Sequence, residues 1–233
     1  MADFATLRAE MVAGQLRGRG IVDERVLVAM GEAPREAFVP PRLRHRAYAD
    51  SALPIGEDQT ISQPWIVAAI CQALELRGPE RVLEIGTGSG YSACVLSLLT
   101  AEVLSIERHQ SLALAARETL ASLMVTNVEL VLGDGSGGLP ERAPFEAIAV
   151  HALAPAPPPA LLAQLAGGGR MVVPIASGSV DTLTLLRLRG ELVHAGAPDA
   201  LPVEDLVRDR EHQFAGLRRF ASHNSSSRGA MSP

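Results

Sequence analysis

The sequence has 233 residues, a formal net charge of -5 at pH 7 and a pI near 5.7. This length suits one globular domain, and 47% hydrophobic residues provide enough apolar surface for a full core. The acidic balance argues against nucleic acid or an anionic membrane as a partner, and no apolar run approaches the length of a bilayer span. Because the first residues also lack the pattern of a signal peptide, we expect a cytoplasmic protein.

The chain contains two cysteines, Cys71 and Cys94, and both fall in predicted helices without metal-ligand spacing. Buried free thiols are the favoured interpretation. We therefore expect no metal.

The first forty residues predict two helices. Apolar residues recur at roughly helical spacing from Leu7 to Leu16, and Asp23 is placed to cap a second helix. Residues 42–59 show little regular pattern and predict an ordered loop, which in a compact domain usually has a function. Pro64 then begins a strongly apolar helix over 65–76.

The central motif of the chain is a strand followed by a glycine turn. Residues 81–85 form an apolar run typical of a strand that is buried on both faces. Gly86, Gly88 and Gly90 follow, and they allow a tight turn that approaches a ligand closely. A helix is predicted over 91–99, so the turn is expected to be a ligand site.

The spacing of the glycines separates two nucleoside cofactors. The dinucleotide fingerprint is G-x-G-x-x-G, whereas here the third glycine comes one residue early and Tyr91 takes its place. A predicted strand over 101–106 ends in Glu107, whose carboxylate can accept hydrogen bonds from both ribose hydroxyls. Either cofactor satisfies that rule, but the E-x-G-x-G-x-G form from Glu84 to Gly90 favours S-adenosylmethionine over NAD.

The rest of the chain alternates helices and strands, which predicts right-handed crossovers and a mostly parallel sheet. Leucines resume helical spacing from Leu161 to Leu165, and Gly167–Gly169 predicts a tight turn into the next strand. The segment from Ala195 to Pro202 is ambiguous. Further elements are expected as a helix over 111–123 and strands over 128–132, 145–150, 170–175 and 182–188.

Several motifs together resemble the protein-L-isoaspartate (D-aspartate) O-methyltransferase family. The likeness runs from about Met11 to Pro174, and the Thr-Ile-Ser-Gln-Pro element is its most particular part. The matching stretches are PREAFVP (34–40), ADSALPIG (49–56), QTISQP (59–64), VLEIGTGSGY (82–91), GDG (133–135), APF (143–145) and QLAGGGR (164–170).

This resemblance implies an α/β fold of the class I, Rossmann-like methyltransferase type, with a mostly parallel seven-stranded sheet and extra N-terminal helices. It implies a single domain over 1–220, in which 1–78 supply helices and an acceptor-side loop and 79–220 the cofactor-binding sheet. Residues 221–233 are expected to be a flexible tail. We expect a monomer.

The activity implied is methyl transfer from S-adenosyl-L-methionine to the free carboxylate of L-isoaspartyl residues in damaged proteins or peptides, with S-adenosyl-L-homocysteine as product. The ester then breaks down through a succinimide, which restores some normal aspartate. This is protein repair.

The cofactor residues follow from the motifs. Glu84 is expected near the cofactor's ammonium group or reacting centre, Glu107 at the ribose, and Asp134 at the adenine amino group beside Gly135. The alternatives are a buried structural acid for Glu84, a solvated strand-end charge for Glu107 and a turn-forming role for Asp134. The other expected cofactor-binding residues are Gly86, Thr87, Gly88, Ser89 and Gly90.

Ser62 is the predicted catalytic residue. A carboxylate acceptor is already ionised and needs no general base, so the enzyme must place it in line with the methyl group and replace its water with fixed donors. The Ser62 hydroxyl is such a donor; the alternative, which can coexist with this role, is that it caps the helix beginning at Pro64. Ile61 and Gln63 are expected to line the substrate site beside it, while Asp50 and Gln59 flank the loop and have structural roles at least as plausible.

His151 and Ala152 are the other expected substrate-binding residues, and His151 departs from the family pattern, where a small residue is common. It follows a strand at the edge where open α/β sheets bind ligands. A second departure is Ala200–Val203, where a Phe-Val-Pro-Leu-like segment is expected. We hypothesise that His151 narrows or recharges the acceptor pocket.

Three other functions remain open from the sequence alone. The first is a relative that modifies a dedicated peptide or an ordinary aspartyl residue. The second is an NAD-dependent oxidoreductase, and the third is a cofactor-binding protein without catalysis.

Overall fold

The computed structural model describes residues 3–177, 180–188 and 206–208. The ambiguous segment 195–202, the departure at Ala200–Val203 and the predicted tail 221–233 lie outside these residues.

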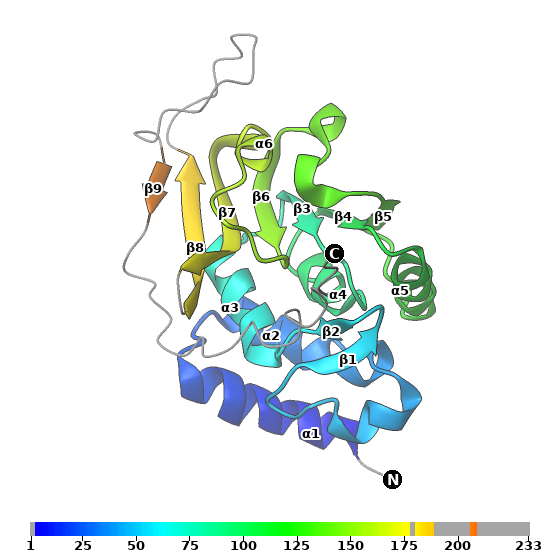
Figure 1. The fold of residues 1–233 in the computed structure, drawn as a ribbon. Helices are drawn as coiled ribbons and strands as arrows, with labels where there is room; N and C mark the ends of the chain where they lie inside the picture. Colours follow the sequence, from blue (N-terminus) through cyan, green and yellow to red (C-terminus); the bar gives the residue numbers. More distant parts are fainter. Residues whose placement is uncertain (1–2, 178–179, 189–205, 209–233) are drawn as a thin grey trace, which may run out of the picture.

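One large sheet forms the centre of the described structure (Figure 1). Its seven strands lie in the order β5-β4-β3-β6-β7-β8-β9, and the first five are parallel. Strand β8 runs antiparallel to both of its neighbours, β7 and β9. The predicted α/β fold with a mostly parallel sheet is confirmed. The strands are β3 Arg81–Ile85, β4 Glu102–Glu107, β5 Val128–Leu132, β6 Phe145–Val150, β7 Leu165–Ser177, β8 Val180–Leu188 and β9 Leu206–Arg208.

Strand β3 is the point where the strand order reverses, because the chain continues to β4 on one side and later returns to β6 on the other. Ligands of open α/β sheets bind beyond the carboxyl ends of the strands at such a switch point. The carboxyl ends of β3, β4 and β6 are therefore the expected location of the site.

Helices cover the sheet, and the N-terminal ones pack on the same face as α3 and α4 (Figure 1). The predicted caps are present: the Asp23 side chain accepts from the Arg25 N–H at the start of α2, and Pro64 is the first residue of α3. The α-helices are α1 Phe4–Glu10, α2 Glu24–Glu32, α3 Pro64–Leu74, α4 Tyr91–Ser97, α5 Gln110–Ser122 and α6 Pro159–Leu162.

The core has two parts, one on each face of the sheet. Val82 of β3 packs with the N-terminal helices, α3 and α4, whereas its neighbour Leu83 packs with Ile148 and Met171 on the face covered by α6. Successive side chains of a strand point to opposite faces, so a continuous apolar run such as 82–85 is buried on both. This holds the end of β3 rigidly.

The prediction of an irregular loop over 42–59 is wrong in part. Pro41–Arg46 form a 3₁₀ helix, and β1 (Leu53–Gly56) pairs with β2 (Gln59–Ile61) in an antiparallel hairpin. The loop of the hairpin is Glu57-Asp58, with φ angles of 50° and 53°. Two-residue hairpin loops with positive φ normally contain Asn or Gly, so Glu57-Asp58 does not predict such a turn.

The prediction of a helix continuing to Leu165 is also wrong. Helix α6 ends at Leu162, and β7 already begins at Leu165, so Gly167–Gly169 lie within the strand instead of in a turn before it. The register between β6 and β7 shifts here. A Cβ at Gly169 would lie 2.8 Å from the carbonyl oxygen of Ala166, so this irregularity needs a glycine.

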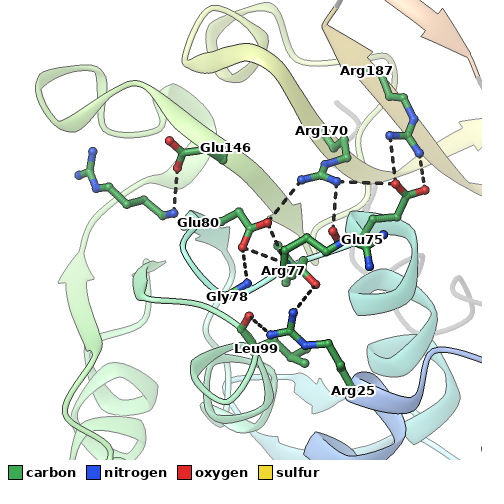
Figure 2. Close-up of polar contacts among 11 residues, drawn as sticks. Arg25, Glu75, Arg77, Gly78, Glu80, Leu99, Glu146, Arg170 and Arg187 are labelled. Carbon is green, nitrogen blue, oxygen red and sulfur yellow. Dashed lines mark hydrogen bonds and ion pairs between the residues drawn. The ribbon is translucent and has the colours of Figure 1, made fainter.

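Arginines and glutamates tie the sheet together at the edge opposite the glycine turn (Figure 2). The Glu75 carboxylate lies 2.6 Å from the Arg187 guanidinium and 3.7 Å from that of Arg170. Arg170 in turn lies 3.8 Å from Glu80, which also accepts backbone N–H groups from Arg77 and Gly78. This network fixes the connection from α3 to β3, and hence the level at which β3 ends.

Candidate cofactor and acceptor site

The glycine turn after β3 has the backbone conformation that its sequence predicts. Gly86, Gly88 and Gly90 all have positive φ angles, of 92°, 54° and 89°. The N–H groups of Gly86 and Thr87 both donate to the carbonyl oxygen of Ile106 on β4, at 2.9 and 3.2 Å. The turn is thus fixed to the neighbouring strand, and its backbone faces the carboxyl edge of the sheet.

Glu107 is part of this turn. Its side chain is buried, and its two carboxylate oxygens accept the N–H groups of Gly88 at 2.8 Å and of His109 at 2.9 Å. The alternative of a solvated strand-end charge is therefore wrong. Each carboxylate oxygen can accept a second hydrogen bond, so capacity remains for ribose hydroxyls.

Glu84 is fully buried, and in the sheet it lies opposite Ser105 of β4. Its Oε2 accepts from the Ser105 hydroxyl at 2.5 Å, and Ser105 in turn lies 2.5 Å from the Thr87 hydroxyl. No donor among the described residues reaches Oε1 with hydrogen-bond geometry, although His151 Nε2 lies 3.2 Å away. A buried carboxylate oxygen without a donor is costly, and an ammonium group at this position would remove the cost.

His151 lies against Glu84 at the end of β6. Its backbone N–H donates to Ile85 at 2.9 Å, and its Nε2 is 2.9 Å from the Ser92 hydroxyl. Only 10% of the imidazole is exposed, and a Cβ added at Gly86 would lie 3.5 Å from the His151 Cβ. The ring is thus directed towards the base of the glycine turn, while the next residue, Ala152, is exposed.

Asp134 and Gly135 bring a third strand end to the site. The Asp134 carboxylate accepts from the Ser136 N–H at 2.9 Å, and hydrogen bonds from Ser136 hold the pKa of Asp134 below its ordinary value. The turn-forming role is therefore present. A Cβ at Gly135 would lie 2.7 Å from Ile85 Cγ2, so glycine lets the turn after β5 pack directly on the end of β3.

The hairpin β1–β2 lies beside the glycine turn that precedes α4 (Figure 1). A Cβ added at Gly88 would lie 3.4 Å from Ile55 Cδ1. The hydroxyl of Ser111 donates to the Glu57 carboxylate, which also lies 3.8 Å from the His109 imidazole. The hairpin therefore lies against the glycine turn and also contacts the first turn of α5.

Ser62 follows this hairpin directly. It is half-buried, and its hydroxyl makes no hydrogen bond within the described part of the chain. The N-cap of α3 is Gln63, without a side-chain cap, so the alternative that Ser62 caps the helix is wrong. Gln63 donates to Asp50, which pairs with Arg19 at 2.9 Å, while Ile61 is buried in the core.

The sequence interpretation missed Ser92 and Ser105, the hydroxyls that touch His151 and Glu84. Ser105 is a polar residue inside the apolar run of β4, and a buried hydroxyl in such a strand requires a partner. Its partner follows from the parallel register, which pairs it with Glu84.

Cys71 and Cys94 are buried free thiols, and burial raises the pKa of both, that of Cys94 to about 11. Within the described ranges, no group of three potential ligands from His, Cys, Asp or Glu is placed to hold a metal ion. None of the helices described has the length and apolarity to cross a membrane.

Comparisons with known proteins agree with this geometry. The sequence profile of "Protein-L-isoaspartate(D-aspartate) O-methyltransferase" matches residues 7–195. The protein-L-isoaspartate O-methyltransferase of Methanoculleus marisnigri is 52% identical over 179 residues, or 77% of this chain and 81% of the relative. The protein-L-isoaspartate O-methyltransferase 1 of an Anaeromyxobacter species is 57% identical over 169 residues, or 72% of this chain and 79% of the relative.

Two solved structures share the fold. A protein-L-isoaspartate O-methyltransferase, 29% identical, superposes with a TM-score of 0.70 over 82% of this chain and 66% of its own. A putative enzyme of this name from Plasmodium falciparum, solved with S-adenosyl-L-homocysteine, gives a TM-score of 0.67 at 22% identity over 82% of this chain and 96% of its own. With a family profile that spans most of its length and relatives at more than half identity, this chain belongs to the protein-L-isoaspartate(D-aspartate) O-methyltransferase family.

Proposed function

We propose that the carboxyl edge of β3, β4 and β6 is where this chain carries out the reaction of its family. That reaction transfers a methyl group from S-adenosyl-L-methionine to the free α-carboxylate of an L-isoaspartyl residue. The observation that carries the proposal is the hairpin β1–β2. Its Ile55 side chain lies beside Gly88, 3.4 Å from where a Cβ would stand, and its second strand runs directly into Ser62. Donor and acceptor residues therefore meet at one edge.

On the cofactor side, Glu107 would hold the ribose hydroxyls, with Gly86–Gly90 against the methionine part and Asp134 at the adenine. The free Oε1 of Glu84 fits the ammonium group, since a buried carboxylate oxygen needs a donor. S-adenosylmethionine supplies an electrophilic methyl group on a sulfonium, which leaves as a neutral thioether.

On the acceptor side, the substrate carboxylate is itself the nucleophile, so the protein needs only to orient and desolvate it. Ser62 would donate its hydroxyl to one carboxylate oxygen, flanked by Ile61 and Gln63. His151 and Ala152 would border the same space from β6. The resulting ester is the species that closes to a succinimide, which makes the methyl transfer a repair step.

We further propose that residues 1–220 form one domain that acts as a monomer in the cytoplasm, without nucleic acid or membrane partners. A core shared between the N-terminal helices and the sheet supports the single domain. The net charge of -5 supports the absence of polyanionic partners.

The test compares two peptides that differ only in L-isoaspartate or L-aspartate at one position. With labelled S-adenosylmethionine, we expect methyl ester only on the isoaspartyl peptide, and labelling of the aspartyl peptide alone would contradict the repair function in favour of a dedicated aspartyl substrate. Thermal shifts provide a second test, because stabilisation by NAD but not by S-adenosylhomocysteine would contradict methyl transfer altogether.

A further inference from the structure

The environment of Glu84 contains one partner that can carry a positive charge. The carboxylate is fully buried on β3 and accepts from the neutral hydroxyl of Ser105 on β4. Burial, together with the charge of the nearby Glu84, raises the pKa of the Cys71 thiol on α3, which keeps that thiol neutral. No arginine among the described residues pairs with it. The imidazole of His151, 3.2 Å from Oε1, is therefore the available cation.

The contacts of the His151 ring are compatible with Nε2 either carrying a proton or not. One ring nitrogen, Nε2, lies 2.9 Å from the Ser92 hydroxyl and 3.2 Å from Glu84 Oε1. If Nε2 carries a proton, the imidazolium charge lies 3.2 Å from the Glu84 carboxylate and attracts it, although this contact lacks hydrogen-bond geometry. If Nε2 is bare, it accepts from Ser92, and two lone pairs then face each other across the 3.2 Å contact with Glu84.

The same oxygen, Glu84 Oε1, is the one that the proposed function assigns to the cofactor's ammonium group. Two cations cannot both lie against one buried carboxylate oxygen without repelling each other, and low polarity strengthens that repulsion. The arrival of one cation therefore disfavours the other.

We propose that His151 is a positioning residue that holds the Glu84 carboxylate in the cofactor-free protein and loses its Nε2 proton to solvent when the ammonium group of S-adenosylmethionine or S-adenosylhomocysteine binds. This inference rests on the proposed function, and it adds a coupling between cofactor binding and a proton. After binding, neutral His151 accepts from Ser92, and Glu84 pairs with the ligand.

The proposed loss of the His151 proton makes cofactor affinity depend on pH. At a pH where His151 is protonated, binding must release its proton, so the affinity falls as the pH falls. The other ionisable groups at this edge are Glu57, Glu107, Arg108, His109 and Asp134, and His109 is the second histidine there. It lies by the ribose-binding carboxylate, not by Glu84.

Two ligands separate these contributions. S-adenosylhomocysteine carries the ammonium group, whereas 5′-methylthioadenosine keeps the adenine, ribose and thioether but lacks the whole amino-acid part. Calorimetry in buffers of different ionisation enthalpy measures the protons released on binding. We expect S-adenosylhomocysteine to bind roughly tenfold more weakly at about pH 5.5 than at about pH 7.5. At the lower pH its binding should release a proton. Methylthioadenosine should show neither effect.

Variants assign the proton. His151→Asn should make the affinity for S-adenosylhomocysteine independent of pH, whereas the matched control His109→Asn should keep the difference between the two ligands. An NMR titration of the histidine ring signals in the unmodified protein gives a readout that needs no variant, and the His151 signal should move to its neutral position when S-adenosylhomocysteine is added at about pH 6.

The outcomes distinguish this inference from the proposed function. Binding of S-adenosylhomocysteine with the same pH dependence as methylthioadenosine, or with an unchanged His151 signal, would overturn the role of His151 and leave the methyltransferase site intact. Failure of both ligands to bind at any pH would overturn the site itself.

Discussion

Glu107, the last residue of β4, accepts a hydrogen bond at 2.8 Å from the backbone N–H of Gly88, in the turn that follows the neighbouring strand β3. One buried carboxylate thus fixes the glycine turn and retains free acceptor capacity towards the cofactor. The turn and the carboxylate proposed to bind the ribose are a single unit.

Glu107→Gln should weaken cofactor binding, because an amide has one acceptor oxygen and cannot serve both backbone N–H groups and the ribose. We expect a loss of about 1.5–3 kcal/mol, or roughly tenfold to a hundredfold in the Kd of S-adenosylhomocysteine by calorimetry. Glu102→Gln is the matched control, since Glu102 begins the same strand and pairs with Arg81 at the opposite edge. Equal losses in both variants would contradict a local role.

Gly135→Ala should destabilise the protein, because the new Cβ would lie 2.7 Å from Ile85 Cγ2. Overpacking of this kind costs about 1–3 kcal/mol in the free energy of unfolding, measured by denaturant titration. Gly133→Ala, two residues earlier, meets nothing within 4 Å and should be close to neutral. If the clash is the cause, the Gly135→Ala effect should shrink in an Ile85→Ala background, and a cost that persists there would refute it.

Ser62→Ala should lower turnover on an isoaspartyl peptide while leaving the melting temperature unchanged. The hydroxyl has no hydrogen bond within the described residues and does not cap α3, so its removal costs the fold little. We expect a loss of roughly tenfold or more in kcat/KM, as for a lost substrate-orienting contact. Thr60→Ala, on the exposed face of β2, provides the comparison. A full rate in Ser62→Ala would remove the residue from the site.

Glu80 should make stability depend on pH. Burial acts to raise its pKa, but backbone hydrogen bonds, including those from Arg77 and Gly78, and the charge of Arg170 outweigh it, so the pKa is lowered. A carboxylate with a lowered folded-state pKa stabilises the protein above its unfolded value of about 4.3, and that stabilisation is lost as the pH falls below it.

Glu80→Gln should therefore be less stable than the natural sequence at pH 7, and the difference should shrink between about pH 5 and about pH 3. The free energy of unfolding, followed by circular dichroism across this range, measures it. Glu118→Gln, at an exposed position of α5, should show no such convergence. A difference that is constant with pH would point to packing instead of charge.

Local signals explain what the sequence predicted correctly. The apolar run of β3, the glycines after it and the acid at the end of β4 each depend on a few adjacent residues, and all three lie where they were expected. The parallel order of the sheet also followed, because alternating helices and strands leave few other arrangements.

What the sequence did not predict depends on contacts between distant segments. The hairpin β1–β2 turns on Glu57-Asp58 with positive φ, and contacts of Ile55 and Glu57 with Gly88 and Ser111 stabilise it from outside. No local pattern contains these contacts. The Glu84–His151 pair joins residues 67 positions apart (151 − 84), and it exists only because β3 and β6 are neighbours in the sheet.

The hairpin also links the two halves of the proposed site. Its Ile55 side chain lies beside Gly88 of the turn proposed to bind the methyl donor, and its second strand leads into Ser62, the serine proposed to orient the acceptor. If both proposals hold, the hairpin borders both substrates, and the two are not independent ligands. If the bound cofactor raises the affinity for the peptide by some factor, the bound peptide must raise the affinity for the cofactor by the same factor, because coupling between two binding sites is reciprocal. An affinity measured for either substrate alone therefore describes only half of a coupled equilibrium.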